Sequence, residues 1–236
     1  MKPINKYIDH TNLKPFATAA DITQLCAEAA EHHFASVCVN PADVALAHSL
    51  LGDTDVMTCT VIGFPLGKNV TAIKVEETKA AYRDGCDEFD MVINVGKLKD
   101  RDLDYVCADI AAVVAAAQGK TVKVIIETGL LTDEEIAIAT QLSCKAGAHF
   151  VKTCTGVNPG AATVEAIAIM KANKTDNVCI KASGGVKTFE AAQAMIAAGA
   201  DRIGTSSGIA IVSGGVGNMI DRLFREGVDA LGNVYY

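Results

Sequence analysis

Two lysines lie inside apolar, β-rich runs of this 236-residue chain. Lys152 follows His149–Val151, Lys181 follows Val178–Ile180, and each run ends shortly afterwards in a glycine turn. Lysine is almost never fully buried without a partner. Two lysines in consecutive inner strands therefore indicate a site in which one ammonium keeps the other amine neutral. A neutral lysine amine is a nucleophile toward carbonyl carbons.

The chemical gain from such a pair is large. An ordinary lysine pKa of ~10.4 leaves only about 0.04% of the amine neutral at pH 7. A nearby cation and burial together can lower the pKa by ~3 units, which raises the neutral fraction on the order of 10³-fold. The amine then forms an imine with an aldehyde. The protonated imine is an electron sink that labilises a neighbouring carbon–carbon bond or α-proton, and a nearby carboxylate can move the protons.

Further charged residues are expected to face the interior of a barrel, because side chains alternate between the two faces of a strand. We expect Asp90 and Lys152 to share one layer of a barrel interior, and Lys123 and Lys181 to share the adjacent layer. The alternative is structural. Lys152 and Lys181 would then lie at strand ends or pair with Asp90 and Glu127, and Lys123 would be a partly exposed, ion-paired lysine.

Three turns rich in glycine and hydroxyl groups follow the last three apolar runs. Backbone N–H groups in such turns, with a helix N-terminus behind them, bind anions without a net positive charge. Phosphate sites after the seventh and eighth strands are a habit of the (β/α)₈ barrel. The alternative is that the glycines serve only the turn geometry. The turns are Thr155–Gly156, Ser183–Gly185 and Gly204–Gly208.

Strand-like runs and helical patterns alternate along the whole chain, which is typical of a parallel α/β sheet. The predicted strands are 7–10, 36–40, 57–64, 88–94, 122–128, 150–155, 178–183 and 202–206. The predicted helices are 21–33, 41–50, 70–84, 100–117, 132–146, 159–173 and 187–198. Eight units in this length favour a single-domain (β/α)₈ TIM barrel spanning residues 1–236, with an open doubly wound sheet as the alternative.

Local signals support the helix limits. Thr132 and Glu135 form a capping-box pattern. Asn40 and Asn158, each followed by proline, are predicted N-caps.

Composition narrows the class of protein. The net charge of −7 argues against a nucleic-acid surface, and no apolar run is long enough to span a bilayer. The eight cysteines contain no C-x-x-C pair and are expected to be reduced core thiols. The N-terminus lacks the apolar region of a signal peptide. We therefore expect a cytoplasmic protein without a metal site, since the five histidines do not cluster.

Several motifs together resemble the 2-deoxyribose-5-phosphate aldolase family, a class I aldolase family with a (β/α)₈ barrel. The resemblance extends nearly end to end. The motifs are Ile8–Pro15, Val61–Gly67, Glu88–Asn94, Lys123–Thr128, Phe150–Thr153, Lys181–Val186 and Arg202–Ser207.

The resemblance implies a role for each matching position. Lys152 would form the Schiff base, Lys181 would be the neighbouring ammonium, and Asp90 would move protons through water with Lys123. Asp9 would line the substrate hydroxyl region. The phosphate loops would comprise Thr155, Gly156, Gly184, Gly185, Gly204, Ser206 and Ser207, and a terminal tyrosine, Tyr236, would reach the site or belong to a disordered tail.

The chain also departs from that family. Val157 stands where the family often has Lys or Arg, which removes a point charge from the phosphate site. Cys154, Ala182–Ser183 and Lys187 replace the family's frequent Ser, Pro-Ala and Arg.

The leading hypothesis is reversible cleavage of 2-deoxy-D-ribose 5-phosphate to D-glyceraldehyde 3-phosphate and acetaldehyde, without metal or organic cofactor. The alternatives are a Schiff-base aldolase for another phosphosugar and a non-catalytic phosphosugar sensor. The partners would be small phosphosugars and aldehydes, with neither nucleic acid nor membrane. The half-exposed apolar helices are compatible with a homodimer or a higher homo-oligomer.

Overall fold

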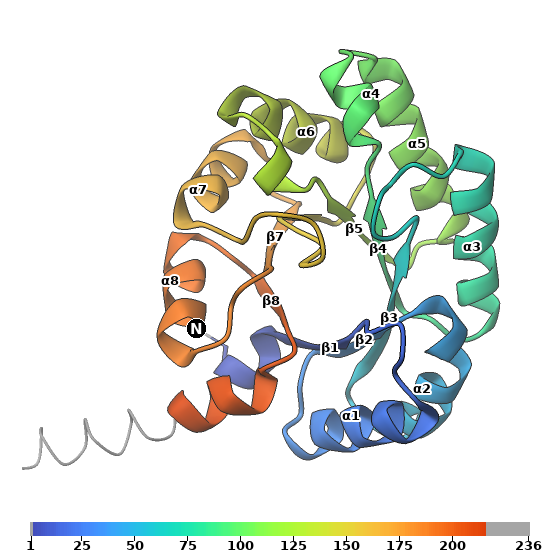
Figure 1. Ribbon diagram of the computed structural model, residues 1–236, viewed down its shortest axis with the longest axis vertical. Helices are drawn as coiled ribbons and strands as arrows, with labels where there is room; N and C mark the ends of the chain where they lie inside the picture. Colours follow the sequence, from blue (N-terminus) through green and yellow to red (C-terminus); the bar gives the residue numbers. More distant parts are fainter. Residues whose placement is uncertain (1, 216–236) are drawn as a thin grey trace, which may run out of the picture.

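Eight parallel strands close into a barrel in the computed structural model, which describes residues 2–215. Each strand pairs with the next one in sequence, and β8 pairs with β1 through Ile8 and Ile203, which excludes the open sheet. The expected (β/α)₈ architecture is confirmed, and Figure 1 shows the ring of helices around the strands. The strands are β1 (Ile8–Asn12), β2 (Ser36–Val39), β3 (Met57–Ile62), β4 (Glu88–Val92), β5 (Thr121–Ile125), β6 (Phe150–Lys152), β7 (Cys179–Ser183) and β8 (Arg202–Thr205).

The helices lie between the strands, as the alternation predicts. They are α1 (Ala19–Glu31), α2 (Val44–Leu51), α3 (Thr71–Arg83), α4 (Val95–Lys99), α5 (Leu103–Ala116), α6 (Asp133–Lys145), α7 (Val164–Asn173) and α8 (Phe189–Ala198). Three short 3₁₀ helices are η1 (Ile4–Tyr7), η2 (Pro41–Asp43) and η3 (Thr128–Leu130). The capping box of Thr132 and Glu135 begins α6 as predicted.

Several predicted boundaries were wrong at the carboxyl ends of strands. The run 57–64 leaves the sheet after Ile62, because Gly63 turns the chain at φ +62°. The run 150–155 pairs only through Lys152. These apolar residues continue into loops at the barrel mouth instead of extending the strands.

The helix predicted at 159–173 begins only at Val164, where the Thr163 hydroxyl accepts a hydrogen bond from the backbone N–H of Ala166. Asn158 is therefore not an N-cap, and its side-chain amide is used in the loop contacts described below. Asn40 precedes η2 without a side-chain capping bond. The short helix α4 was not predicted at all.

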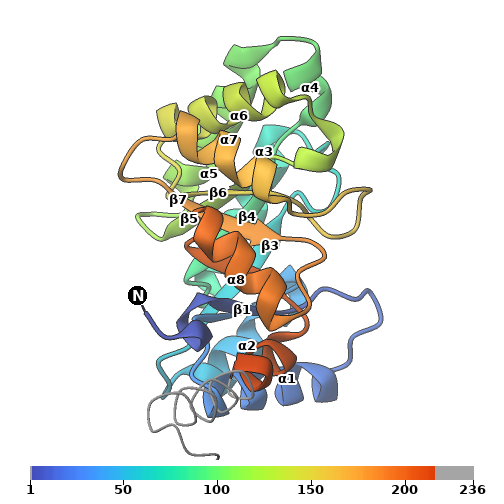
Figure 2. The same ribbon diagram turned by 90° about the vertical axis from the view of Figure 1, so that its left-hand side faces the viewer.

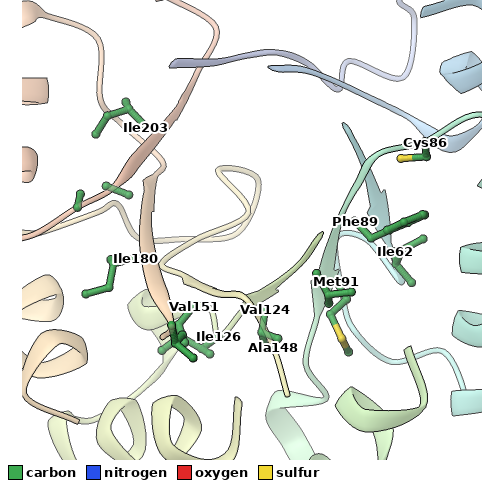
Figure 3. Packing of buried hydrophobic residues seen from close by; sticks show 14 of the residues in the cluster. Ile62, Cys86, Phe89, Met91, Val124, Ile126, Ala148, Val151, Ile180 and Ile203 are labelled. Carbon is green, nitrogen blue, oxygen red and sulfur yellow. The ribbon is translucent and has the colours of Figure 1, made fainter. Parts of the chain in front are cut away.

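The hydrophobic core lies between the barrel and the helices. Figure 3 shows side chains such as Phe89, Met91 and Ile180 pointing away from the barrel centre toward the helices. Because neighbouring residues of a strand face opposite sides, their neighbours Asp90 and Lys181 face the interior. The fold thus turns a period-two sequence pattern into an apolar outer layer and a polar centre.

The carboxyl ends of the strands share one face of the barrel. In Figure 2 the loops after β1, β6 and β7 project from the same side of the molecule. Within residues 2–215, none of the helices combines the length and the apolarity that a bilayer crossing requires. The predicted domain range of 1–236 includes residues 216–236, which lie outside the described part of the chain.

Candidate active site

Asp90 is the centre of a buried ion-pair cluster inside the barrel. It is fully buried on β4. Its Oδ2 accepts hydrogen bonds from Lys152 Nζ at 2.8 Å and from Lys181 Nζ at 2.7 Å, and its Oδ1 accepts one from Lys123 Nζ at 2.9 Å. The four residues singled out in the sequence therefore meet at one carboxylate.

The register of the strands explains this convergence. Asp90 pairs with Lys123 across β4 and β5, and Lys152 pairs with Lys181 across β6 and β7. We expected the lysines to occupy two separate layers, but their long side chains reach the same carboxylate from different strands. Glu127 does not pair with either lysine, so that part of the structural alternative was wrong.

Two further carboxylates and an arginine complete the cluster. Lys181 Nζ lies 2.5 Å from Asp9 Oδ2, and Lys123 Nζ lies 2.6 Å from Glu88 Oε2. The guanidinium of Arg202 bridges Asp9 and Glu88, with Nη2 at 2.9 Å from Glu88 Oε2. Asp9 thus belongs to the lysine network.

Sequence reasoning missed Glu88 and Arg202. The signal for Glu88 was available, because it lies two residues before Asp90 on the same strand face.

Burial and ion pairing oppose each other in setting the pKa values of this cluster. Burial by itself raises the pKa of Asp90, but the ammonium groups of Lys123, Lys152 and Lys181 outweigh it and hold the pKa well below its usual value. Burial lowers the pKa of Lys181, but Asp9 and Asp90 outweigh it and raise the pKa. Lys181 is therefore a cation and Asp90 a carboxylate at neutral pH.

Among the residues that the structure describes, the cluster holds one more cationic side chain than carboxylates. The cations are Lys123, Lys152, Lys181 and Arg202, and the carboxylates are Asp9, Glu88 and Asp90. An uncompensated charge is costly in a buried site. Loss of one proton would make the cluster neutral and so remove this cost. Among the described residues, Lys152 has one carboxylate partner, Asp90, whereas Lys123 and Lys181 have at least two each.

A cavity of about 500 Å³ lies at the carboxyl ends of the strands. Within residues 2–215, its lining contains two lysines, Lys14 and Lys187, and no carboxylate, which suits an anion, so we call it the anion cavity. Gly184 and Gly185 adopt φ values of +97° and +80°, which L-residues with side chains rarely adopt. The lining residues are Thr11–Pro15, Thr155–Val157, Ser183–Lys187 and Gly204–Ser206. Lys14, in the loop after β1, was not predicted as a site residue.

The predicted phosphate loops fall into three groups. Thr155, Gly156, Gly184, Gly185 and Ser206 line this cavity. Gly204 also lines it, and a Cβ there would lie 2.4 Å from Ser183 Oγ and 2.9 Å from Lys181 Cε, so this position packs closely against the lysine. Ser207 is half-buried beyond the lining. Tyr236 lies outside the described residues.

Two cysteines lie beside the cluster. Cys38 and Cys59 are register partners on β2 and β3, and their sulfur atoms and an Asp90 oxygen all lie within 4.8 Å of one another. Sequence reasoning did not pair them. Lys123 Nζ lies 3.4 Å from Cys59 Sγ, and Asp90 is already bound by three ammonium groups. These positive charges disfavour a metal cation between the thiols.

Known proteins resemble this chain over nearly its whole length. The family model for DeoC/LacD family aldolases matches residues 4–214. A deoxyribose-phosphate aldolase from an Exiguobacterium species (strain AT1b) is 59% identical over 211 residues, which cover 89% of this chain and 96% of the relative. A deoxyribose-phosphate aldolase from Bdellovibrio bacteriovorus is 54% identical over 212 residues, which cover 90% and 96%.

A solved structure is also similar. The deoxyribose phosphate aldolase from Aeropyrum pernix, described as having a unique tetrameric structure, superposes with a TM-score of 0.83 at 30% identity and covers 89% of both chains.

Proposed function

We propose a reaction for this chain on the basis of its family, since it belongs to the DeoC/LacD aldolases. It is a class I aldolase that reversibly cleaves 2-deoxy-D-ribose 5-phosphate. The products are D-glyceraldehyde 3-phosphate and acetaldehyde. The observation that carries the proposal is the convergence of three lysine side chains on the buried carboxylate of Asp90. Relatives that share more than half of the residues and carry the name deoxyribose-phosphate aldolase support the choice of substrate.

Lys152 is the Schiff-base residue in this proposal. Its neutral amine attacks C1 of the open-chain aldehyde, loss of water gives an imine, and protonation of the imine nitrogen gives an iminium. The iminium withdraws electrons while a base removes the proton of the C3 hydroxyl, so that the C2–C3 bond breaks and the triose phosphate leaves. The remaining enamine of acetaldehyde is protonated at carbon, and hydrolysis of the new imine releases acetaldehyde and the amine.

Lys181, Asp90 and Lys123 are the proton-moving and charge-setting residues of this proposal. Lys181 keeps its proton through its contacts with Asp9 and Asp90 and so places a fixed positive charge beside Lys152. Asp90 is ionised at rest because its pKa is lowered, so it begins the reaction as a proton acceptor. Lys123 holds the other Asp90 oxygen in place.

The phosphate group is assigned to the cavity lined by Lys14, Lys187 and the glycine turns after β6, β7 and β8. Two cationic side chains and backbone N–H groups offer charge-assisted hydrogen bonds to its oxygens. The aldehyde end of the same substrate then extends toward Lys152.

Borohydride reduction in the presence of acetaldehyde tests the proposal. Reduction of the imine leaves an ethyl group on the amine, and we expect it on the peptide that contains Lys152. K152M is expected to lose both the adduct and at least about 10³-fold in cleavage rate. K79M is the matched control, because Lys79 is exposed on α3 and pairs only with Glu76 among the described residues.

Two outcomes contradict the proposal in different ways. Cleavage by K152M near the native rate would exclude the Schiff base at this residue. Binding of the phosphosugar with neither adduct nor cleavage in the native protein would favour the sensor. Comparison of deoxyribose, ribose and hexose phosphates as substrates separates this reaction from that of another Schiff-base aldolase.

We also propose a cytoplasmic location and assembly into a homo-oligomer. The eight cysteines are free thiols, which suits a reducing compartment. The tetrameric description of the Aeropyrum pernix structure supports an oligomer, and light scattering of the purified protein measures its mass.

A further inference from the structure

Glu127 is a buried carboxylate outside the lysine cluster. It follows β5 and is 1% exposed. Its backbone lies in the left-handed region at φ +60°, ψ +61°, where glycine is favoured and a long side chain is strained. A glutamate at this position indicates that the side chain is needed there.

The contacts of Glu127 bind one loop to the barrel. Its Oε1 accepts a hydrogen bond from the backbone N–H of Thr155 at 3.1 Å. Its Oε2 accepts hydrogen bonds from Thr155 Oγ1 at 2.6 Å and from Asn158 Nδ2 at 2.9 Å. The carboxylate therefore collects three donors from the segment that follows β6.

Further hydrogen bonds complete this loop. Thr155 Oγ1 accepts hydrogen bonds from the backbone N–H groups of Val157 at 3.2 Å and Asn158 at 3.3 Å. Asn158 Nδ2 also donates to the carbonyl oxygen of Pro65 at 3.2 Å, which joins the loop after β6 to the loop after β3. Glu127 is thus the anion around which two mouth loops are organised.

This network limits what Thr155 can offer to a phosphate. Its N–H and its O–H both donate to Glu127, so neither donor is directed at the anion cavity. Glu127 does not line that cavity, whereas Thr155, Gly156 and Val157 do. Glu127 lies instead against a neighbouring cavity of about 300 Å³, which it lines with Asn158.

We propose that Glu127 is a positioning residue that holds the 155–158 loop in the conformation that receives the substrate phosphate. Its carboxylate accepts the hydrogen bonds of Thr155 and Asn158, so these donors are not available to the phosphate. The phosphate is therefore bound by the backbone at Gly156 and by the turns after β7 and β8. The proposal rests on the proposed function, since it concerns the phosphate end of the same substrate.

The test compares a phosphorylated and an unphosphorylated substrate. In E127Q the side-chain NH₂ replaces an acceptor and faces the donors of Thr155 and Asn158. We expect its KM for 2-deoxyribose 5-phosphate to rise at least about tenfold, as for loss of a charge-assisted hydrogen bond. We expect its KM for unphosphorylated 2-deoxyribose and its rate of acetaldehyde trapping at Lys152 to change less than about twofold.

Variants of Thr155 test the same contacts from the other side. T155V removes the hydroxyl and is expected to reproduce the E127Q defect. T155S keeps it and is expected to restore most of the phosphate preference. The double variant E127Q/T155V should be no worse than either single variant, because both break one network. E134Q is the matched control, since Glu134 is exposed and pairs with Arg101.

An unchanged preference for the phosphorylated substrate in E127Q and T155V would overturn the proposal. Equal losses on both substrates would also overturn it, because they would show a general structural role. If E127Q does not fold, the comparison of T155V with T155S decides. Failure of the proposed function is a separate result, since the native protein would then show no acetaldehyde adduct.

Discussion

Val157 gives the anion cavity an apolar rim. It is 61% exposed, and Lys14 and Lys187 are the two lysines in the lining. Deoxyribose-phosphate aldolases often have a lysine or an arginine at the position of Val157. In the proposed phosphate site, the cationic side chains therefore come from the loops after β1 and β7.

V157K is expected to lower the KM for 2-deoxyribose 5-phosphate about fivefold, because an added charge pair at an exposed site contributes about 1 kcal/mol. Steady-state kinetics at low and high salt measures the effect, which should shrink as salt screens the charge. V157Q is the control for side-chain size. A similar gain on unphosphorylated deoxyribose would contradict a phosphate contact.

The sequence predicted the lysine cluster better than its surroundings. Lys152, Lys181, Lys123 and Asp90 were identified because a charged residue within an apolar strand is conspicuous. Arg202, at the first position of its strand, was not conspicuous in this way. Lys14 escaped prediction because an exposed loop lysine has no distinguishing pattern, and its position depends on how the barrel closes.

At the scale of elements, a second buried ion pair supports β4 from outside the barrel. Lys74 on α3 and Asp109 on α5 are 0% and 1% exposed, and Lys74 Nζ lies 2.6 Å from Asp109 Oδ2. Lys74 Nζ also donates to the carbonyl oxygen of Val92 at 2.9 Å. The pair therefore fixes two helices to the end of the strand that carries Asp90.

K74M is expected to destabilise the protein by about 3–5 kcal/mol, because it leaves the Asp109 carboxylate buried without its cation. Urea denaturation measures the change. The double variant K74M/D109L should recover much of the loss, since it removes both charges. K79M is again the control, as Lys79 is exposed on the same helix. A double variant no more stable than K74M would contradict this account.

Element types were predicted more accurately than element ends. The eight strands follow from apolar runs, but the carboxyl ends of those runs enter loops whose hydrogen bonds come from distant residues. Asn158 illustrates this point: beside a proline it resembles an N-cap, yet Glu127 and Pro65 bind its side chain. A local pattern contains no information about such partners.

At the scale of the whole molecule, the barrel closes around seven charged side chains, so its stability depends on their protonation. Asp9 and Asp90 have lowered pKa values, because Arg202 and the lysines outweigh burial. Their contribution to stability is present above the unfolded pKa of ~3.9 and is lost as the pH falls through the folded values. Lys123 and Lys181 have raised pKa values, so their contribution is present below ~10.4 and is lost as the pH rises through the folded values.

We therefore expect the free energy of unfolding to decrease as the pH is lowered from about 4. Each proton taken up on unfolding contributes about 1.36 kcal/mol per pH unit, so these two carboxylates together contribute up to about 2.7 kcal/mol per pH unit. Urea denaturation between pH 3 and pH 6 measures the slope. D9N should lose about half of this contribution even where it is less stable at neutral pH, because the slope counts protons and not contacts.

D55N separates the contribution of a surface carboxylate to the acid slope from that of the buried cluster. Asp55 is exposed, and Lys6 and His33 hold its pKa at about 2, so it also takes up a proton when the chain unfolds in acid. D55N should remove that part of the slope and leave the part that is lost in D9N. If D9N and the native protein had the same slope below pH 4, the pKa of Asp9 would not be lowered in the folded barrel, which would contradict its stabilisation by Arg202 and Lys181.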